Sequence, residues 1–296
     1  MQTVTPKGSF DLLHQNQYFN GWPTLSDNSN TIVMTFPVED WSGSVAVTLT
    51  QPTKDNVEIA IYGDGNAEAA LQQALAAMSL DEDGSDWQAI GKKDSFILDL
   101  QEKYKYMRPT LFHSAYEAAA AFIIGHRITI AQARKVRATV AQEHGAKIKV
   151  GEETFAAFPA PEVLLRIDSI KGLNETKITR LHAVAQAALD GKLSREHLRS
   201  MPEADALAEL ETLPGIGAFF SQGILYRGVG IKDGFTKDDM TFHAIKTAYS
   251  LPEDASVESM VAIANKWQPY RMWAIVLLHV WLRETNNYPK RTFSKR

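Results

Sequence analysis

Cysteine is absent from this chain of 296 residues. Its absence excludes disulfide bonds, a thiolate nucleophile, and zinc sites or iron–sulfur clusters held by cysteine. Long apolar runs are also missing, since none reaches the roughly 18 residues that a membrane-spanning helix needs. The amino terminus, MQTVTPKGSF, lacks the basic-then-apolar order of a signal peptide. We therefore expect a cytoplasmic protein with no membrane contact.

Several catalytic motifs are missing as well. The chain contains no HExxH, no GxxxxGK followed by Ser or Thr, and no GxGxxG between a strand and a helix. These absences argue against zinc hydrolase, P-loop and dinucleotide-binding chemistry. We predict no metal site and no cofactor, and leave open only a monovalent cation at the hairpin described below.

Basic residues are scarce in the first part of the chain. Residues 1–90 contain only Lys7 and Lys54 against twelve acids, a balance of −10; the 29 bases and 23 acids that follow give +6, within a net charge of −4. A polyanion would therefore meet the second part rather than the first. Solvated surfaces on two separate domains would give the same imbalance.

The two parts also differ in hydrophobic period. Between residues 31 and 62, TIVMTFPV, SVAVTLTQ and VEIAIYG have β-branched residues and partial alternation, which predict antiparallel strands, with a helix near residues 66–79. From about residue 90, almost everything has the helical period. We predict an α+β protein in which residues 1–88 form a small mixed α/β domain and residues 89–296 a larger helical domain of two subdomains.

Helix ends can be placed within the second part. Ser114 begins SAYE, a capping-box pattern in which Glu117 returns a bond to the start of the helix. Gly145 and Gly191 are expected to end two later helices, and Asn174 to begin one. The apolar segment PYRMWAIVLLHVWLRE is expected to pack inside the protein.

A tight turn, LPGIG, joins two predicted helices within residues 203–228. Gly215 and Gly217 can adopt positive φ, and the N–H groups that begin the next helix, together with its positive end, can hold a phosphate. Gly215, Ile216 and Gly217 are therefore candidates for contact with a nucleic-acid backbone. A plain αα-hairpin with a glycine turn explains LPGIG alone equally well.

The residues that follow favour the first reading. LPGIG, a short helix, a loop ending at Phe235 and the pair Asp238-Asp239 before another helix resemble the helix-hairpin-helix DNA glycosylases of base excision repair. The resemblance covers roughly residues 90–285. The amino-terminal sheet domain is similar to that of the bacterial 3-methyladenine DNA glycosylase II type, which implies a helix-hairpin-helix glycosylase core after it.

The resemblance implies a role for Asp239, which matches the family's aspartate. Cleavage of an N-glycosidic bond passes through a transition state with oxocarbenium character, which a nearby carboxylate stabilises. An alkylated base already carries positive charge and needs little help from a general acid. Taken alone, either aspartate would be a helix cap. After the hairpin, we assign catalysis to Asp239, and capping or structural support to Asp238.

Phe219 occupies the position at which family members that also cut the strand have a lysine, whose amine forms a Schiff base with the sugar. The phenylalanine predicts a monofunctional enzyme that leaves an abasic site. The missing cysteines independently exclude the cluster found in the endonuclease III branch.

The target base must leave the helical stack, so the resemblance implies an aromatic pocket for it. Trp281 matches the family position that stacks on the flipped base, and Phe219, Tyr18 and Phe19 are weaker candidates. Ordinary core packing is the alternative for each of them, and the favoured one for Tyr18 and Phe19.

Two places depart from the family pattern. His126 and Arg127 stand where relatives commonly have glutamine and an apolar wedge that fills the gap left by the flipped base; they are our candidates for intercalation or base flipping, with a helix-end charge pair as the alternative. Gly223 stands where an aromatic residue is common, which predicts a roomier or differently lined pocket.

We therefore expect a monomeric, nucleoid-associated enzyme whose partner is double-stranded DNA containing damaged bases. Its activity would be the removal of alkylated purines such as 3-methyladenine and 7-methylguanine. The alternative is a helix-hairpin-helix DNA-binding protein that is catalytically silent or has another specificity.

Overall fold

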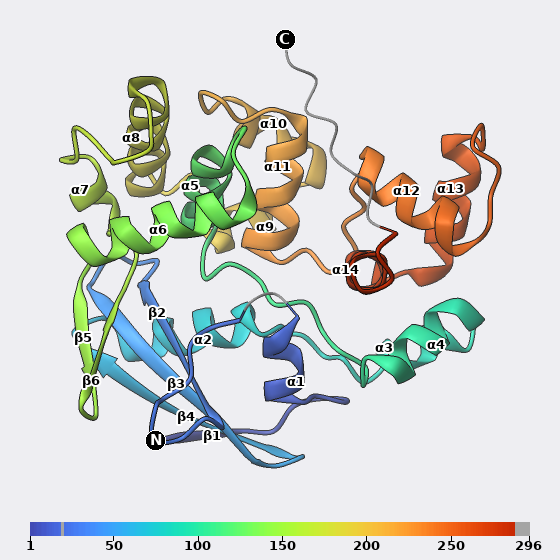
Figure 1. Ribbon diagram of the computed structural model, residues 1–296, viewed down its shortest axis with the longest axis horizontal. Coiled ribbons are helices and arrows are strands. Elements are labelled where there is room, and N and C mark those ends of the chain that lie inside the picture. The colour runs from blue at the N-terminus through green and yellow to red at the C-terminus, as the bar shows by residue number, and fades with distance from the viewer. Residues whose placement is uncertain (19–20, 288–296) are drawn as a thin grey trace. The chain divides into compact units, whose positions relative to one another are not determined.

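The computed structural model describes residues 1–18 and 21–287, which divide into two compact units interleaved along the chain (Figure 1). The first lies within Met1–Pro6, Phe19–Glu82 and Thr110–Ile231, and the second within Lys7–Tyr18, Asp83–Pro109 and Lys232–Arg296. The division at residues 88 and 89 rests on composition and stays a prediction. Phe19 and the basic tail from Tyr288 lie outside the described residues.

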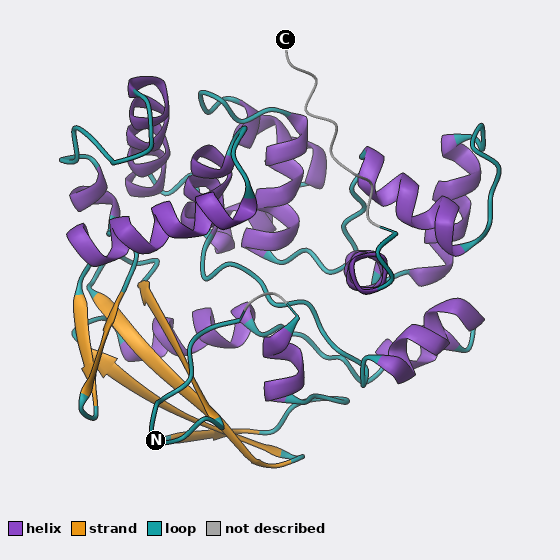
Figure 2. Cartoon of the chain, viewed as in Figure 1, coloured by secondary structure: helices purple, strands orange, loops and turns teal. Residues whose placement is uncertain are grey.

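The first unit contains a four-stranded antiparallel sheet, orange in Figure 2, of strand order β1-β4-β3-β2. Its strands are β1 (Gln2–Val4), β2 (Thr31–Pro37), β3 (Ser44–Thr53) and β4 (Asn56–Gly63). The predicted strands β2 to β4 are confirmed, and so is the helix after them, α2 (Ala67–Ala77), which Asn66 caps. Strand β1 is too short for its alternation to be read from the sequence.

A second, two-stranded sheet was not expected. Strands β5 (Lys147–Val150) and β6 (Glu153–Ala156) form a hairpin whose Ile148 and Val150 pack with Val33 and Ala46 of the large sheet. The prediction that almost everything after residue 90 is helical therefore has an exception at this hairpin. Strand β5 is only four residues long, and in it Ile148 and Val150 alternate with the exposed Lys147 and Lys149. An alternation over four residues is too short to be distinguished from one turn of a helix.

The remaining elements of the first unit are helices. They are α5 (Ala115–Gly125), α6 (Ile130–His144), α7 (Pro161–Leu164), α8 (Glu175–Leu189), α9 (Arg195–Ser200), α10 (Glu203–Glu211), α11 (Ala218–Ile224) and the π-helical turn η1 (Leu225–Val229). Ser114 and Asn174 cap α5 and α8 as predicted, and Gly145 ends α6. Helix α5 is buried along most of its length, in agreement with its apolar sequence.

Glu117 does not complete the predicted capping box. The Ser114 hydroxyl accepts the Glu117 N–H at 3.0 Å, but the Glu117 carboxylate accepts from His113 Nδ1 at 2.6 Å and from Arg137 of α6. The box is instead complete at Thr129 and Gln132, which begin α6. A buried carboxylate binds the strongest donors within reach, and here these are two basic side chains.

The second unit is helical. It contains α1 (Leu12–Gln17), α3 (Trp87–Gly91), α4 (Ser95–Lys103), α12 (Asp239–Ala248), α13 (Val257–Ala264), the 3-10 turn η2 (Asn265–Trp267) and α14 (Arg271–Glu284). Helix α14 is mostly buried, as its sequence predicts. Asp94, the N-cap of α4, accepts hydrogen bonds from Tyr249 at 2.6 Å and Trp267 at 3.0 Å, which ties α4 to α12 and η2. Within the described residues, no helix combines the length and apolarity that crossing a membrane requires.

Candidate functional site

The LPGIG hairpin joins α10 to α11 in the first unit. Gly215 has φ +86°, and a Cβ built on it would lie 2.6 Å from Cδ of Arg180 on α8. Both facts require glycine there, because a side chain would be strained and would displace the arginine. Ile216 is buried and its N–H bonds to Leu213 O at 3.0 Å, so the turn is anchored in the helical core.

Gly217 is the N-cap of α11, without a side chain to satisfy the first N–H groups of the helix. A Cβ added to Gly217 would meet nothing within 4 Å, so the backbone here is accessible from solution. The contact of Gly215, Ile216 and Gly217 with a DNA backbone stays a prediction. The structure leaves space for a phosphate group at Gly217, whereas the side chain of Ile216 is buried and only its backbone could make such a contact.

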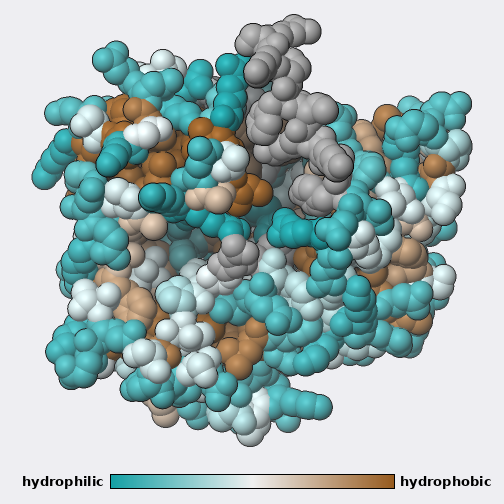
Figure 3. Space-filling view, viewed as in Figure 1, coloured by the Kyte–Doolittle hydropathy of each residue, from teal (hydrophilic) through white to brown (hydrophobic). Residues whose placement is uncertain are grey.

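Phe219 follows two residues later and is 56% exposed. Its ring centroid lies 5.9 Å from that of Phe220 and 6.5 Å from that of Phe122 on α5. Such exposure is unusual for a phenylalanine, which burial would stabilise. Figure 3 shows hydrophobic surface, in brown, over helices of this unit. Phe219 is therefore available to a ligand, although its predicted role in a base pocket is not tested by these contacts.

The space beside Gly223 is filled. A Cβ on Gly223 would lie 2.3 Å from Cζ of Phe122, whose ring packs directly against the glycine. Of the two outcomes predicted from this glycine, the roomier pocket is therefore wrong at this position, and the differently lined pocket stays a prediction. The space left by the missing side chain is instead occupied by the ring of Phe122 from the neighbouring helix α5.

His126 and Arg127 lie at the end of α5. His126 is its C-cap, and its ring meets that of Phe220 edge-on at 5.7 Å. Arg127 is exposed and has φ +59°, a left-handed conformation that is uncommon for arginine. Lys177 of α8 donates to the carbonyl oxygens of Ile124 and His126, both at 2.8 Å, and so fixes the end of this helix.

Positive charge gathers around His126. Burial of its ring lowers the pKa, and the positive charges of Arg127, Lys177 and Arg180 lower it further. Sequence reasoning found Arg127 but missed Lys177 and Arg180. Their spacing of three residues on a predicted helix puts both on one face, which was the available signal.

In the second unit, Asp238 and Asp239 have separate roles. Asp238 is the N-cap of α12, and its carboxylate accepts from the Thr241 N–H at 2.8 Å, which confirms the predicted cap. Asp239 is the first residue of the helix and is exposed. Its carboxylate makes no hydrogen bond or ion pair with residues that the structure describes. This group is free to act on a ligand.

Trp281 and Tyr18 belong to the same unit as Asp239. Trp281 is half-buried on α14, which packs against α12, and its ring meets Phe96 of α4 edge-on at 5.1 Å. The Tyr18 hydroxyl lies 3.2 Å from His14 Nε2, and its ring packs edge-on against Tyr104. Tyr104 in turn donates to Glu284 at the end of α14 at 2.9 Å. The Tyr18 contacts agree with packing, while Trp281 is only partly buried.

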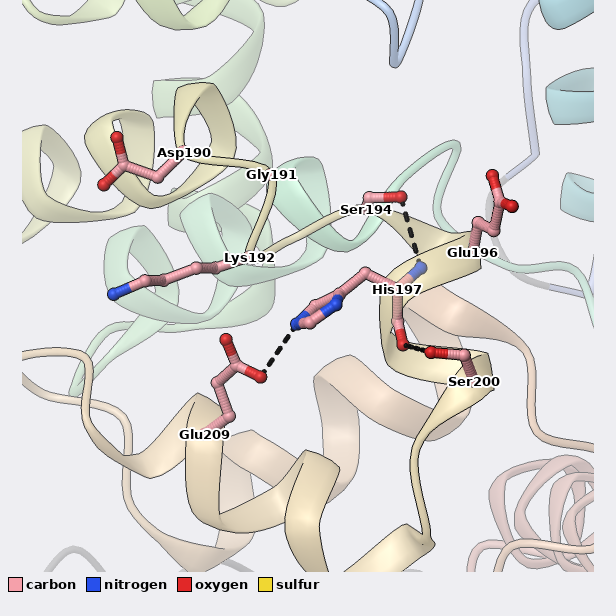
Figure 4. A pocket seen from close by; sticks show the side chains of 8 residues that line it. All are labelled: Asp190, Gly191, Lys192, Ser194, Glu196, His197, Ser200 and Glu209. Carbon is pink, nitrogen blue, oxygen red and sulfur yellow. Dashed lines mark hydrogen bonds and ion pairs between the residues drawn. The ribbon is translucent and has the colours of Figure 1, made fainter.

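A separate polar hollow of about 540 Å³ lies between α8, α9 and α10 (Figure 4). His197 Nε2 lies 2.9 Å from Glu209 Oε2 within it, and Lys192, Asp190 and Glu196 also line it. It contains none of the predicted site residues. Its three carboxylates would repel a polyanion, so we do not assign it to the same function.

Known proteins resemble the chain in sequence. A segment of 174 residues is 31% identical to DNA-3-methyladenine glycosylase 2 of Escherichia coli, and the match covers 57% of this chain and 58% of that protein. The chain therefore spans less than two thirds of this relative's length. No family model matches the chain.

Solved structures resemble it over nearly its whole length. The 3-methyladenine DNA-glycosylase from Archaeoglobus fulgidus gives a TM-score of 0.77 at 19% identity and covers 96% of this chain and 98% of its own. The 8-oxoguanine glycosylase/lyase of Clostridium acetobutylicum, in complex with double-stranded DNA containing cytosine opposite 8-oxoguanine, gives 0.69 at 16% identity, covering 97% and 99%. These likenesses establish the α+β fold, and the fold alone does not select a base.

Proposed function

We propose that this chain is a monofunctional DNA N-glycosylase of the helix-hairpin-helix superfamily that removes alkylated purines from double-stranded DNA. Its 31% identity to DNA-3-methyladenine glycosylase 2 of Escherichia coli over 174 residues supports the proposal. Water replaces the base at C1′ of the sugar, the base leaves, and an abasic site remains. The relative in Escherichia coli is named for 3-methyladenine, which supports this class of base.

One observation carries the proposal: the exposed carboxylate of Asp239 at the start of α12. A capping role was the main alternative for this aspartate, and Asp238 performs it. The Asp239 carboxylate can therefore stabilise positive charge that develops on the sugar, or orient the attacking water. An alkylated purine leaves as a neutral base, so no second carboxylate is needed to protonate it.

The absence of a lysine at Phe219 supports hydrolysis without strand cleavage. A lyase step needs an amine that attacks C1′ and forms a Schiff base. A phenyl ring cannot do this, and its exposure suits contact with a nucleotide instead.

The experiment is release of 3-methyladenine and 7-methylguanine from methylated duplex DNA by the purified protein, followed by borohydride treatment. We expect free base, intact strands and no protein–DNA adduct trapped by borohydride. Binding of the duplex without release of these bases or of deaminated and oxidised ones would contradict the enzyme and favour the non-catalytic binder. A trapped adduct would contradict the monofunctional mechanism.

Trp281 is the proposed stacking surface for the flipped base. Replacing Trp281 by alanine should lower kcat/KM for base release by about 10- to 100-fold, because base–aromatic stacking contributes about 1–3 kcal/mol. Trp281→Phe, which keeps a ring, should retain most of the activity. Steady-state kinetics and thermal unfolding are measured together. A loss of Tm without a loss of kcat/KM would identify Trp281 as a packing residue only.

A further inference from the structure

Three basic side chains of the first unit come together from two separate parts of the chain. Arg127 follows α5, while Lys177 and Arg180 stand on one face of α8. Arg180 lies over Gly215 of the hairpin, and Lys177 bonds to the carbonyl of His126, the neighbour of Arg127. All three lie close enough to His126 for their positive charges to lower its pKa, so the three side chains surround this histidine.

These three cations differ from two other arginines of the same unit, which form ion pairs with carboxylates. Arg137 pairs with Glu117, and Arg199 pairs with Asp81 at 3.2 Å. Within the described residues, Arg127, Lys177 and Arg180 form no ion pair with a carboxylate. Unpaired like charges near one another repel, and this repulsion opposes the folded arrangement. A bound polyanion would offset that repulsion.

Lys177 also has a mechanical role. Its ammonium group donates to the two carbonyls at the end of α5, Ile124 O and His126 O, both at 2.8 Å. The end of a helix carries partial negative charge, so an ammonium group there is stabilising. This contact holds the backbone immediately before Arg127, whose left-handed φ directs the chain into the next helix. Lys177 therefore positions Arg127 in addition to contributing its own charge.

We propose that Arg127, Lys177 and Arg180 form a phosphate-binding surface that holds the backbone of duplex DNA beside the hairpin. This inference rests on the proposed function only in taking DNA as the polyanion. The two arginines contact phosphate oxygens through planar guanidinium groups, which suit such contacts. Such contacts position the duplex and do not distinguish its bases.

The test measures binding of a short undamaged duplex by fluorescence anisotropy between about 50 and 200 mM salt. Each phosphate contact contributes about −0.9 to the slope of log K against log salt. Arg127→Gln and Arg180→Gln should each reduce the slope by about 1, and the double variant by about 2. Lys192→Gln, an exposed lysine just after α8, is the matched control and should leave the slope unchanged.

Lys177→Met tests the positioning role. We expect it to reduce the slope by more than 1, since Arg127 loses its support, and Lys177→Arg should restore most of the loss. A role in stability alone would lower Tm and leave the slope intact. Thermal unfolding of every variant separates the two, and Arg180→Lys keeps a charge at the hairpin if Arg180→Gln fails to fold.

Unchanged slopes in both arginine variants, or a wild type that does not bind duplex DNA, would overturn the inference. Arginine variants whose slope falls no more than that of Lys192→Gln would also overturn it, because the change would then reflect the net charge of the protein alone. The outcome is independent of catalysis: base release tests the proposed function, whereas binding of undamaged DNA tests this surface.

Discussion

Asp239→Asn should abolish base release while duplex binding stays within about two-fold of the wild type. Removing a group that stabilises developing charge typically costs about 10²- to 10³-fold in kcat. Asparagine keeps the size of the side chain but not the negative charge that the oxocarbenium-like sugar requires. Asp239 is exposed and makes no hydrogen bond with the described part of the chain, so the fold should not depend on it.

The neighbouring aspartate supplies the control. Asp238→Asn preserves the N-cap of α12, because asparagine and aspartate cap helices about equally well. It should therefore leave base release nearly unchanged, although it removes the same charge one residue away. Single-turnover release and anisotropy binding are measured for both variants. Equal activity of Asp239→Asn and wild type, or equal losses in both variants, would contradict a catalytic role for Asp239.

The second large effect concerns stability. Glu117→Gln should lower the free energy of unfolding by about 3–5 kcal/mol, because it breaks a buried ion network. Glu117 is 5% exposed, and its carboxylate joins His113 of the segment before α5 to Arg137 of α6. His113 also stacks on Phe36 of β2 at 4.6 Å, so the network links the sheet to the helices of the first unit.

The same carboxylate predicts a loss of stability in acid. Burial alone would raise the pKa of Glu117, but the charge and hydrogen bonds of His113 and Arg137 hold it at about 2. A pKa that is lower in the folded than in the unfolded state stabilises the fold above the unfolded value, here near 4.5. The contribution, about 3 kcal/mol, is lost as pH falls from about 4.5 to about 2.

Chemical denaturation between pH 7 and pH 3 measures both effects. In Glu117→Gln this part of the acid sensitivity should disappear, because glutamine does not titrate. Glu152→Gln is the matched control, since the Glu152 side chain is 98% exposed in the hairpin between β5 and β6. A Glu117→Gln protein as stable as the control at pH 7 would show that the network contributes little.

Much of the fold follows from local sequence signals. Strands β2 to β4, helix α2 and the caps Ser114 and Asn174 were predictable, because period and cap chemistry are determined within a few residues. The β5–β6 hairpin was not, since its strands are stabilised by contact with Val33 and Ala46, more than a hundred residues earlier. The hydrogen-bond partners of the Glu117 carboxylate were not predictable either, because one of them, Arg137, lies on another helix.

In the candidate site, too, features determined by local sequence were predictable, and features determined by tertiary contacts were not. The cap at Asp238 was predictable from α12 itself, and assigning catalysis to Asp239 required the resemblance to a family. The filling of the space at Gly223 by Phe122 was not predictable, because it depends on which ring the neighbouring helix presents. The gathering of Arg127, Lys177 and Arg180 likewise needed the tertiary structure, since fifty residues separate Arg127 from Lys177.

The interleaving of the two units has a consequence for synthesis on the ribosome. Every segment of the first unit has been synthesised once Ile231 is made, whereas α1, α3 and α4 of the second must await α12 to α14. Trp87 finds its partner ring in Trp273 only after that residue has been made. At about 5–20 residues per second, this delay lasts several seconds, during which apolar side chains of a nascent chain are open to chaperones. A truncated chain that ends after residue 231 should therefore form the first unit and leave the other segments unfolded.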